Sequence, residues 1–180
     1  TPEAGTVTAQ GLRLPAGFVG TLPCAECDGI GYRLDLWPDQ VFHLRRVWDG
    51  KDMRRDSIGR WAVDADGATI TLRGADETQQ FRILGPERLA ALPREGAAPA
   101  AGDQAVLKAE AEFHPFEPHL PLRGMLTYAA DAAHFTECLT GRDYPFVLDS
   151  DFPALEHAYL AAGEAGGPVM ASFDGGIVEH

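Results

Sequence analysis

Short runs of alternating apolar and polar residues follow one another through the first half of the chain. This period of two is typical of half-buried β-strands, and turn residues such as Asp49-Gly50 separate the runs at hairpin spacing. The pattern predicts about six to eight short antiparallel strands, and closure into a small barrel would hide their edges. The apolar positions of these runs are Tyr32, Leu34, Leu36, Phe42, Leu44, Trp48, Trp61, Val63, Ile70, Leu72, Phe81, Ile83, Leu89 and Leu92.

A change of composition marks the end of this region. Residues 93–105 are rich in Pro, Gly and Ala without an apolar period, which predicts a surface loop. Val106–Glu112 alternates again and is expected to return as a last barrel strand. His114–Pro121 carries three prolines, which interrupt both helices and central strands. We therefore expect an N-terminal domain over residues 1–113 and a C-terminal domain over residues 122–180.

The C-terminal part combines strand patterns with one helix pattern. The predicted elements are strands over residues 124–128, 135–138, 144–148 and 169–173 and a helix over 153–162. This order, with one helix inserted late, is typical of a small five-stranded OB-like barrel. Either the residues from Gly176 onward form its frayed last strand, or the displayed chain is incomplete there. The predicted buried face of the helix consists of Leu155, Ala158, Tyr159 and Ala162.

Composition and charge narrow the class of protein. Of the 180 residues, 45% are hydrophobic, which is enough for the core of one large or two small domains. The formal net charge of −12 would repel nucleic acids and anionic bilayer surfaces, so nucleic acid is not expected as a partner. No stretch approaches the roughly 20 apolar residues that span a bilayer, and no signal peptide opens the displayed sequence.

Two of the three cysteines, Cys24 and Cys27, form a Cys-x-x-Cys motif. This spacing allows a local disulfide, a reactive thiol pair or a metal site. Two thiolates are too few for Zn(II), which prefers four ligands, but they suffice for near-linear Cu(I). The acidic neighbours Glu26 and Asp28 disfavour thiolates, and strands rather than a βαβ unit follow, so a thiol-disulfide enzyme is the weaker hypothesis. A mutual disulfide and a Cu(I) site both stay open.

The other chemistry-bearing residues are predicted to be structural or solvated. If Cys24 and Cys27 pair, Cys138 is left over, and its place at the end of a strand favours a small core residue. His114 and His119 lie on the Pro-rich connector, where we expect solvated side chains rather than metal ligands. A solvated loop is also expected for three residues of the C-terminal half, namely Asp131, His134 and Glu137.

Two blocks of the sequence resemble one known family. The first is Phe18-Val-Gly-Thr-Leu-Pro-Cys-Ala-Glu-Cys-Asp-Gly-Ile30. The second is Arg123-Gly-Met-Leu-Thr-Tyr-Ala-Ala-Asp-Ala-Ala-His-Phe-Thr-Glu-Cys-Leu-Thr-Gly-Arg-Asp-Tyr-Pro145, with Ala154–Leu160 after it. In this order they resemble the two domains of NlpE-like copper-homeostasis and envelope-stress lipoproteins. The resemblance implies a mainly β protein, with a lipocalin-like N-terminal barrel and an OB-like C-terminal barrel that has one α-helix.

The resemblance also implies a function without catalysis. Such lipoproteins are held at the outer membrane by an N-terminal lipid anchor, which lies outside the displayed sequence, and they face the periplasm. They signal copper, adhesion or lipoprotein-trafficking stress to an inner-membrane sensor kinase. The expected mechanism is protein contact by the N-terminal domain, with Cys24 and Cys27 setting its shape through a disulfide or bound Cu(I). Some relatives hold a disulfide in the C-terminal domain, where this chain has Cys138 alone.

Two alternative functions stay open at this point. A barrel of about eight strands is wide enough for one small apolar ligand, so a carrier would show a cavity lined by the alternating aromatic residues. A thiol-disulfide oxidoreductase would reduce insulin, and the substitution Cys24→Ser would abolish that turnover.

Overall fold

The structure is a computed structural model that describes residues 5–93, 105–129, 132–146, 152–162 and 167–178. The chain divides into two compact units. The first comprises Thr1–Pro118 and Gly176–His180, and the second comprises His119–Gly175. The sequence-based domain limits, 1–113 and 122–180, stay a prediction.

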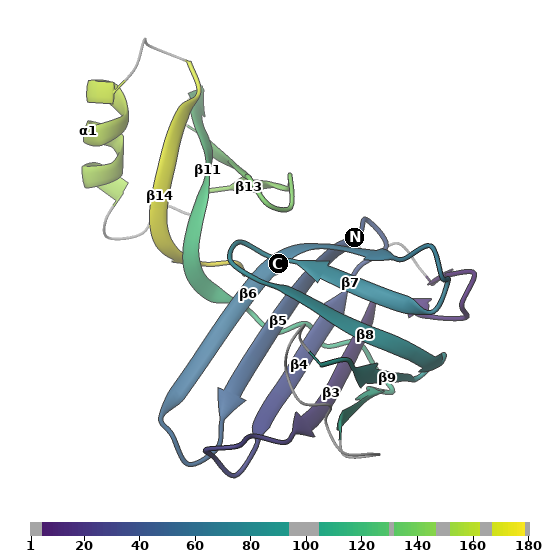
Figure 1. Ribbon diagram of the computed structural model, residues 1–180. Coiled ribbons are helices and arrows are strands. Elements are labelled where there is room, and N and C mark those ends of the chain that lie inside the picture. Colours follow the sequence, from purple (N-terminus) through teal and green to yellow (C-terminus); the bar gives the residue numbers. More distant parts are fainter. Residues whose placement is uncertain (1–4, 94–104, 130–131, 147–151, 163–166, 179–180) are drawn as a thin grey trace. The chain divides into compact units, whose positions relative to one another are not determined.

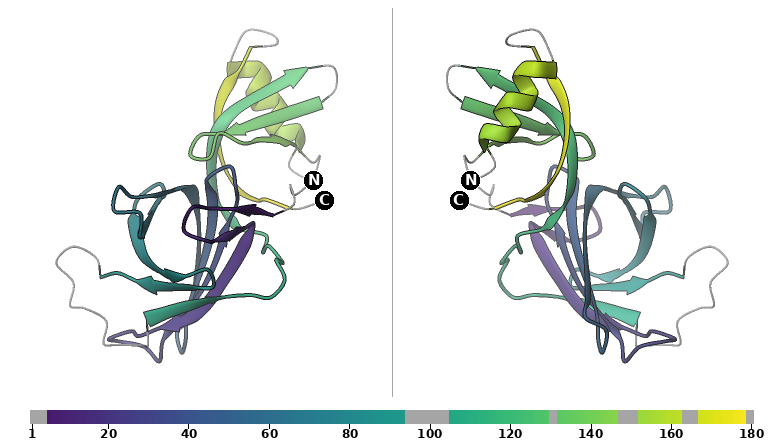
Figure 2. Two further views of the ribbon diagram at one scale, coloured as in Figure 1. Left: turned by 90° about the vertical axis from the view of Figure 1, so that its right-hand side faces the viewer. Right: turned by 90° about the vertical axis from the view of Figure 1, so that its left-hand side faces the viewer.

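Eight antiparallel strands of the described first unit close into a barrel, in the order β10-β3-β4-β5-β6-β7-β8-β9. They are β3 (Ala16–Leu22), β4 (Ile30–Leu36), β5 (Val41–Trp48), β6 (Met53–Val63), β7 (Thr69–Arg73), β8 (Thr78–Gly85), β9 (Arg88–Ala91) and β10 (Val106–Ala109). A short ribbon of β1 (Thr6–Val7) and β2 (Arg13–Leu14) precedes them. The barrel runs from purple β3 to green β10 in Figure 1, and Figure 2 shows it from two further sides. The predicted antiparallel barrel is confirmed.

Alternation along the strands fills the barrel with apolar side chains. Phe18 lies opposite Leu34 and Leu34 lies opposite Leu44, and each is at most 1% exposed. Full burial of a side chain of this size contributes about 2 kcal/mol. The next inward position along β5 after Leu44 is Arg46, a buried cation that forms an ion pair with the partly exposed Glu77. The same face of the sheet therefore supplies both the core and a polar layer near one end of the barrel.

The described part of the second unit is a four-stranded sheet with one helix. The strands are β11 (His119–Ala129), β12 (Ala132–Glu137), β13 (Asp143–Pro145) and β14 (Val169–Gly176), in the order β13-β12-β11-β14, and α1 covers Phe152–Ala162. The ring centroids of Phe135 and Phe173 are 4.9 Å apart. The hydroxyl of Tyr159 donates to the carbonyl oxygen of Gly167 at 2.6 Å, which connects α1 to the chain before β14. Within the described residues, no helix has the length and apolar character that a membrane span requires.

Three details of this unit differ from the sequence-based expectation. Strand β11 includes Pro121, which lies before Gly124, the first residue of its ladder with β12. Of the expected helix face, Tyr159 is buried, whereas Ala158 and Ala162 are exposed. The long tyrosine ring makes the contact that short methyl groups cannot reach. Gly176 ends β14, and the described residues that follow it, 177 and 178, form no strand.

Candidate functional site

Cys24 and Cys27 lie on the loop that joins β3 to β4. They form a disulfide, with their Cα atoms 5.3 Å apart. Both are half-buried, whereas the two residues between them are exposed. Gly29 ends the loop. A larger residue would not fit there without a shift, because a Cβ at this position would lie only 2.7 Å from Cγ2 of Thr21. The loop therefore holds the disulfide at the surface of one end of the barrel.

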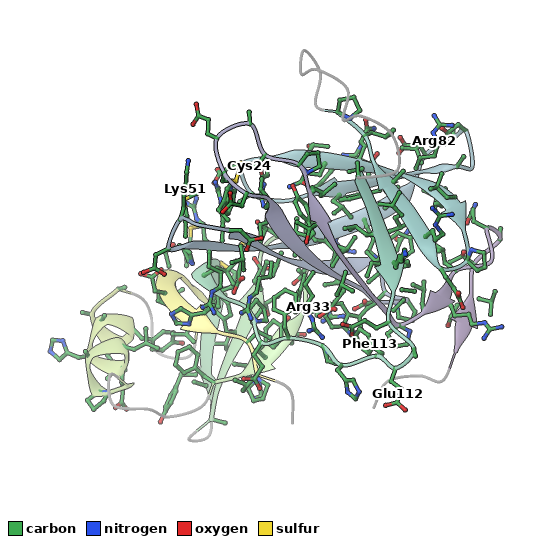
Figure 3. All side chains as sticks on the ribbon, turned by 90° about the horizontal axis from the view of Figure 1, so that it is seen from below. Cys24, Arg33, Lys51, Arg82, Glu112 and Phe113 are labelled. Carbon is green, nitrogen blue, oxygen red and sulfur yellow. A yellow bond between two sulfur atoms is a disulfide. The ribbon has the colours of Figure 1, made fainter. Side chains whose placement is uncertain are left out.

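The same loop is connected to the turn between β5 and β6. The backbone N–H of Asp49 donates to the carbonyl oxygen of Gly29 at 2.9 Å. Sγ of Cys27 lies 3.4 Å from this oxygen, a contact without a hydrogen while the sulfur is in a disulfide. Lys51, labelled in Figure 3, lies 3.9 Å from the carboxylate of Glu26, and this exposed pair contributes little to stability. The carbonyl group of Gly29 thus links the cysteine pair to the β5–β6 turn.

The metal chemistry of this loop depends on its oxidation state. Among the described residues there is no group of three or more His, Cys, Asp or Glu side chains that could hold a metal ion. A structural Zn(II) site, which takes four ligands, does not fit this arrangement. After reduction, Cys24 and Cys27 would supply two soft sulfurs on one short loop, which fits near-linear Cu(I). The residues therefore suit Cu(I) in the reduced form only.

The surroundings of the disulfide differ from those of a thiol-disulfide enzyme. In such enzymes a helix N-terminus stabilises the attacking thiolate. Here Cys24 follows strand β3 and Cys27 precedes strand β4, so neither sulfur lies at the start of a helix. Glu26 and Asp28 add negative charge, which opposes thiolate formation further. This geometry disfavours rapid thiol exchange.

The structure separates the acid-base candidates of the C-terminal half. Asp131 lies outside the described residues. His134 and Glu137 are three apart on β12, so His134 faces solvent while Glu137 is 1% exposed. The Glu137 carboxylate accepts hydrogen bonds from the N–H groups of Leu139 and Thr140 at 2.9 and 2.7 Å. The expectation of a solvated loop is wrong for Glu137, which stabilises the turn after β12.

Cys138 and the two connector histidines all have exposed side chains. The thiol of Cys138 is exposed, so the expected core position is wrong. Its N–H donates to the carbonyl oxygen of Arg123 where β12 ends, and the alternation then directs the side chain outward. His114 is exposed, with its ring 3.3 Å from the carboxylate of Glu112. His119 is the exposed first residue of β11.

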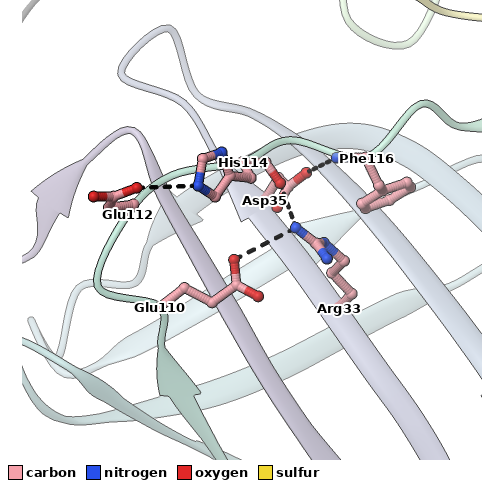
Figure 4. A network of polar contacts seen from close by, with 6 residues as sticks. All are labelled: Arg33, Asp35, Glu110, Glu112, His114 and Phe116. Carbon is pink, nitrogen blue, oxygen red and sulfur yellow. Dashed lines mark hydrogen bonds and ion pairs between the residues drawn. The ribbon is translucent and has the colours of Figure 1, made fainter.

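Sequence reasoning missed a second feature, which is the docking of residues 110–118, here called the strap, on the outer face of β4 and β5 (Figure 4). The N–H of Phe116 donates to the carboxylate of Asp35 at 3.1 Å in a buried setting. The guanidinium of Arg33 donates to the carbonyl oxygen of His114. This part of the Pro-rich connector is therefore fixed to the barrel and is not a free linker.

Arg45 anchors the same strap from β5. Its guanidinium makes two hydrogen bonds to the carboxylate of Asp56, at 2.8 and 2.9 Å, and a third to the carbonyl oxygen of Glu117 at 3.0 Å. It also lies 4.6 Å from the ring centre of Phe116. Hydrogen bonding to Asp56 raises the pKa of Arg45 against the opposing effect of burial, and the charges of Asp56 and Asp35 add to the rise. The anchor therefore stays charged around neutral pH.

Aromatic rings complete the contact under the strap. The ring of Trp37 lies 4.4 Å from that of His43 and 5.5 Å from that of Phe113, measured between centroids. His43, 1% exposed, also lies 6.2 Å from the ring of Phe116. One signal in the sequence could have revealed this feature: two phenylalanines stand in a connector next to strands whose outward positions, such as Asp35, carry polar groups.

The interior of the barrel is filled by its own side chains. Phe18, Phe42 and Phe81, which would line the cavity of a carrier, are each at most 2% exposed. A hollow beside Phe42 and Leu72 measures about 10 Å³, which is room for about one water molecule. The alternating aromatic residues therefore form a core rather than the lining of a ligand cavity.

Comparison with known proteins gives consistent matches along the chain. The family model of the NlpE N-terminal domain matches residues 18–101, and that of the NlpE C-terminal OB domain matches residues 116–179. Lipoprotein NlpE of Escherichia coli (strain K12) is 34% identical over 166 residues, which cover 90% of this chain and 68% of that protein. The crystal structure of the Cpx pathway activator NlpE from Escherichia coli shows 33% identity and a TM-score of 0.40, over 91% of this chain and 85% of that one. The crystal structure of a protein from Shewanella oneidensis, described in its name as a lipoprotein, shows 31% identity and a TM-score of 0.47, over 56% of this chain and 93% of that one.

Proposed function

This chain belongs to the NlpE family, and we propose that it is a signalling lipoprotein of the bacterial envelope. In this proposal an N-terminal lipid holds it at the outer membrane, facing the periplasm. Its N-terminal barrel contacts the inner-membrane sensor kinase of an envelope-stress system and reports copper, adhesion or trafficking stress. The Escherichia coli relative supports this function, because that protein is named a lipoprotein and is described as the Cpx pathway activator.

The observation that carries the proposal is the disulfide of Cys24 and Cys27 on a loop bonded to the β5–β6 turn. In the disulfide the two sulfurs are joined to each other, whereas they must move apart to place Cu(I) between them. The loop therefore has two shapes, and the hydrogen bond from Asp49 to Gly29 passes the difference to a neighbouring turn. A partner protein that contacts this end of the barrel can distinguish the two shapes.

The proposed role is non-enzymatic. The placement of Cys24 and Cys27 between two strands disfavours the thiol-disulfide oxidoreductase, since no helix N-terminus assists either thiolate. The aromatic core of the barrel disfavours the carrier of a hydrophobic ligand. Contact with another protein is the function that would use the disulfide loop and the outer surface of the barrel.

Raised expression of the lipidated protein is expected to induce an envelope-stress reporter several-fold in cells that contain the sensor kinase. The physical reason is that contact with the kinase, a mass-action event, increases with the amount of lipoprotein. The measurement is reporter activity at matched protein levels, and the control strain lacks the kinase gene. Equal induction in both strains would contradict signalling through that kinase.

The reduced protein is expected to bind one Cu(I) ion per chain through Cys24 and Cys27. The double variant Cys24→Ser, Cys27→Ser should lose this binding, because hydroxyl groups are poor ligands for a soft ion. An anaerobic titration against a chromophoric chelator measures it. The matched control Cys138→Ser removes the remaining, exposed thiol and should bind as the wild type does. Equal binding by the double variant and the wild type would reduce the motif to a structural disulfide.

A further inference from the structure

The β5–β6 hairpin carries positive charge in an acidic protein. The whole chain has 27 acidic and 15 basic residues. Residues 45–60, here called the basic hairpin, reverse this balance with six basic and three acidic side chains. The basic ones are Arg45, Arg46, Lys51, Arg54, Arg55 and Arg60, and the acidic ones are Asp49, Asp52 and Asp56.

Most cations of the basic hairpin already have an acidic neighbour within the barrel unit. The pairs are Arg45 with Asp56, Arg46 with Glu77, Lys51 with Glu26 and Arg55 with Asp76. Arg54 differs from these, because it forms no ion pair within the part of the chain that the structure describes, and it is exposed. A guanidinium in this position can bind a carboxylate of another protein without first losing one of its own.

On the outer face of the sheet, Arg54 lies beside one exposed apolar side chain and an open stretch of backbone. Arg54 lies opposite Val47, which is 39% exposed. Gly31 lies opposite Val47 on the other side, and a Cβ built there would approach only the Val47 carbonyl oxygen, at 3.8 Å. One exposed valine has little meaning by itself. Here it lies between an unpaired guanidinium and a strip of open backbone, directly after the disulfide loop.

We propose that the patch formed by Gly31, Val47 and Arg54 binds an acidic surface of the sensor protein. In this complex a carboxylate of the sensor pairs with Arg54, and an apolar side chain beside it covers Val47. The assignment rests on the proposed signalling function and specifies its contact surface and the chemistry of its partner. Charge supports this choice of partner, because Arg54 is a cation that forms no ion pair among the described residues, whereas the acidic remainder of a chain with net charge −12 repels an acidic surface.

The position of the patch also agrees with the signalling role of the disulfide loop. Gly31 follows Gly29 by two residues, and the carbonyl oxygen of Gly29 accepts the N–H of Asp49 in the turn of the basic hairpin. A sensor bound at Val47 and Arg54 would therefore lie next to the cysteine pair. One interface can then contact both the loop and the hairpin.

The test is a binding measurement between the whole chain and the purified periplasmic domain of the envelope-stress sensor kinase. The dissociation constant is measured by calorimetry with the disulfide intact and again after reduction. Arg54→Glu is expected to weaken binding at least about tenfold, because it places like charges in contact. Arg82→Glu on β8 makes the same charge change at an exposed site away from the Lys51 turn in Figure 3, and it should leave binding unchanged.

A second pair of variants tests the apolar part of the patch. Val47→Asp is expected to weaken binding as Arg54→Glu does, and its control is Leu84→Asp, which alters an exposed leucine on β8. Wild-type binding that survives both Arg54→Glu and Val47→Asp would overturn the patch while leaving signalling by contact in place. A wild-type chain that binds in neither redox state would overturn the proposed contact and this inference together.

Discussion

Gly59→Ala is expected to lower the free energy of unfolding by about 3 kcal/mol or more, at the upper end of the range for overpacked cores. Gly59 lies on β6 opposite Phe42, and a Cβ added there would lie 2.0 Å from the carbonyl oxygen of Arg73 and 2.9 Å from Cε1 of Phe42. A backbone oxygen of the neighbouring strand cannot rotate away as the end of a side chain can. The strands β6 and β7 must therefore separate to admit the methyl group. Urea denaturation followed by tryptophan fluorescence measures the loss.

The matched control for this substitution is Gly85→Ala on β8. A Cβ at Gly85 would have no heavy atom within 4 Å. The added methyl group should change stability by less than about 1 kcal/mol, and by restricting the unfolded chain it can raise it. Equal effects of the two substitutions would mean that the barrel yields easily at Gly59, and would contradict the close approach of β6 to β7.

The barrel was predictable because its signal is local. A strand with one buried face repeats every two residues, so Leu34 and Leu36, or Phe42 and Leu44, identify their inward side without knowledge of the fold. The strap could not be found in this way. Phe116 binds Asp35 across 81 residues of chain, and nothing periodic in the connector marks such a contact. Prolines there exclude regular structure, but they do not exclude docking.

The candidate site was predictable to a similar degree and for the same reason. Two cysteines three apart meet wherever the chain turns between them, so the spacing indicated that Cys24 and Cys27 could act together. The predicted environments of Glu137 and Cys138 were wrong. The end of β12 and the turn after it decide which of the two side chains faces inward, and the sequence pattern does not show this. The isolation of Arg54 was beyond sequence reasoning, since it depends on which cations the β7–β8 turn neutralises.

Asp35→Ala is expected to lower the free energy of unfolding by about 3 kcal/mol, since it removes one member of a buried polar network. The Asp35 side chain is fully buried and accepts the N–H of Phe116 at 3.1 Å. Its charge also acts on Arg45, whose guanidinium holds the carbonyl oxygen of Glu117. Without the carboxylate, the amide of Phe116 loses its acceptor and the cation loses part of its compensation. The strap should then leave the barrel more often than the core unfolds.

Amide hydrogen exchange distinguishes release of the strap from general loss of stability. In the wild type the Phe116 amide should exchange slowly, and in Asp35→Ala it should exchange much faster than core amides such as that of Leu34. Asp52→Ala is the matched control, because it removes an exposed carboxylate from the β5–β6 turn and should change stability by less than about 0.5 kcal/mol. If the Phe116 amide stayed protected in Asp35→Ala, the bonds from Arg33 and Arg45 would be sufficient to hold the strap. The carboxylate would then stabilise only the outer face of the barrel, and Arg33 and Arg45 of the barrel would be what fixes the strap.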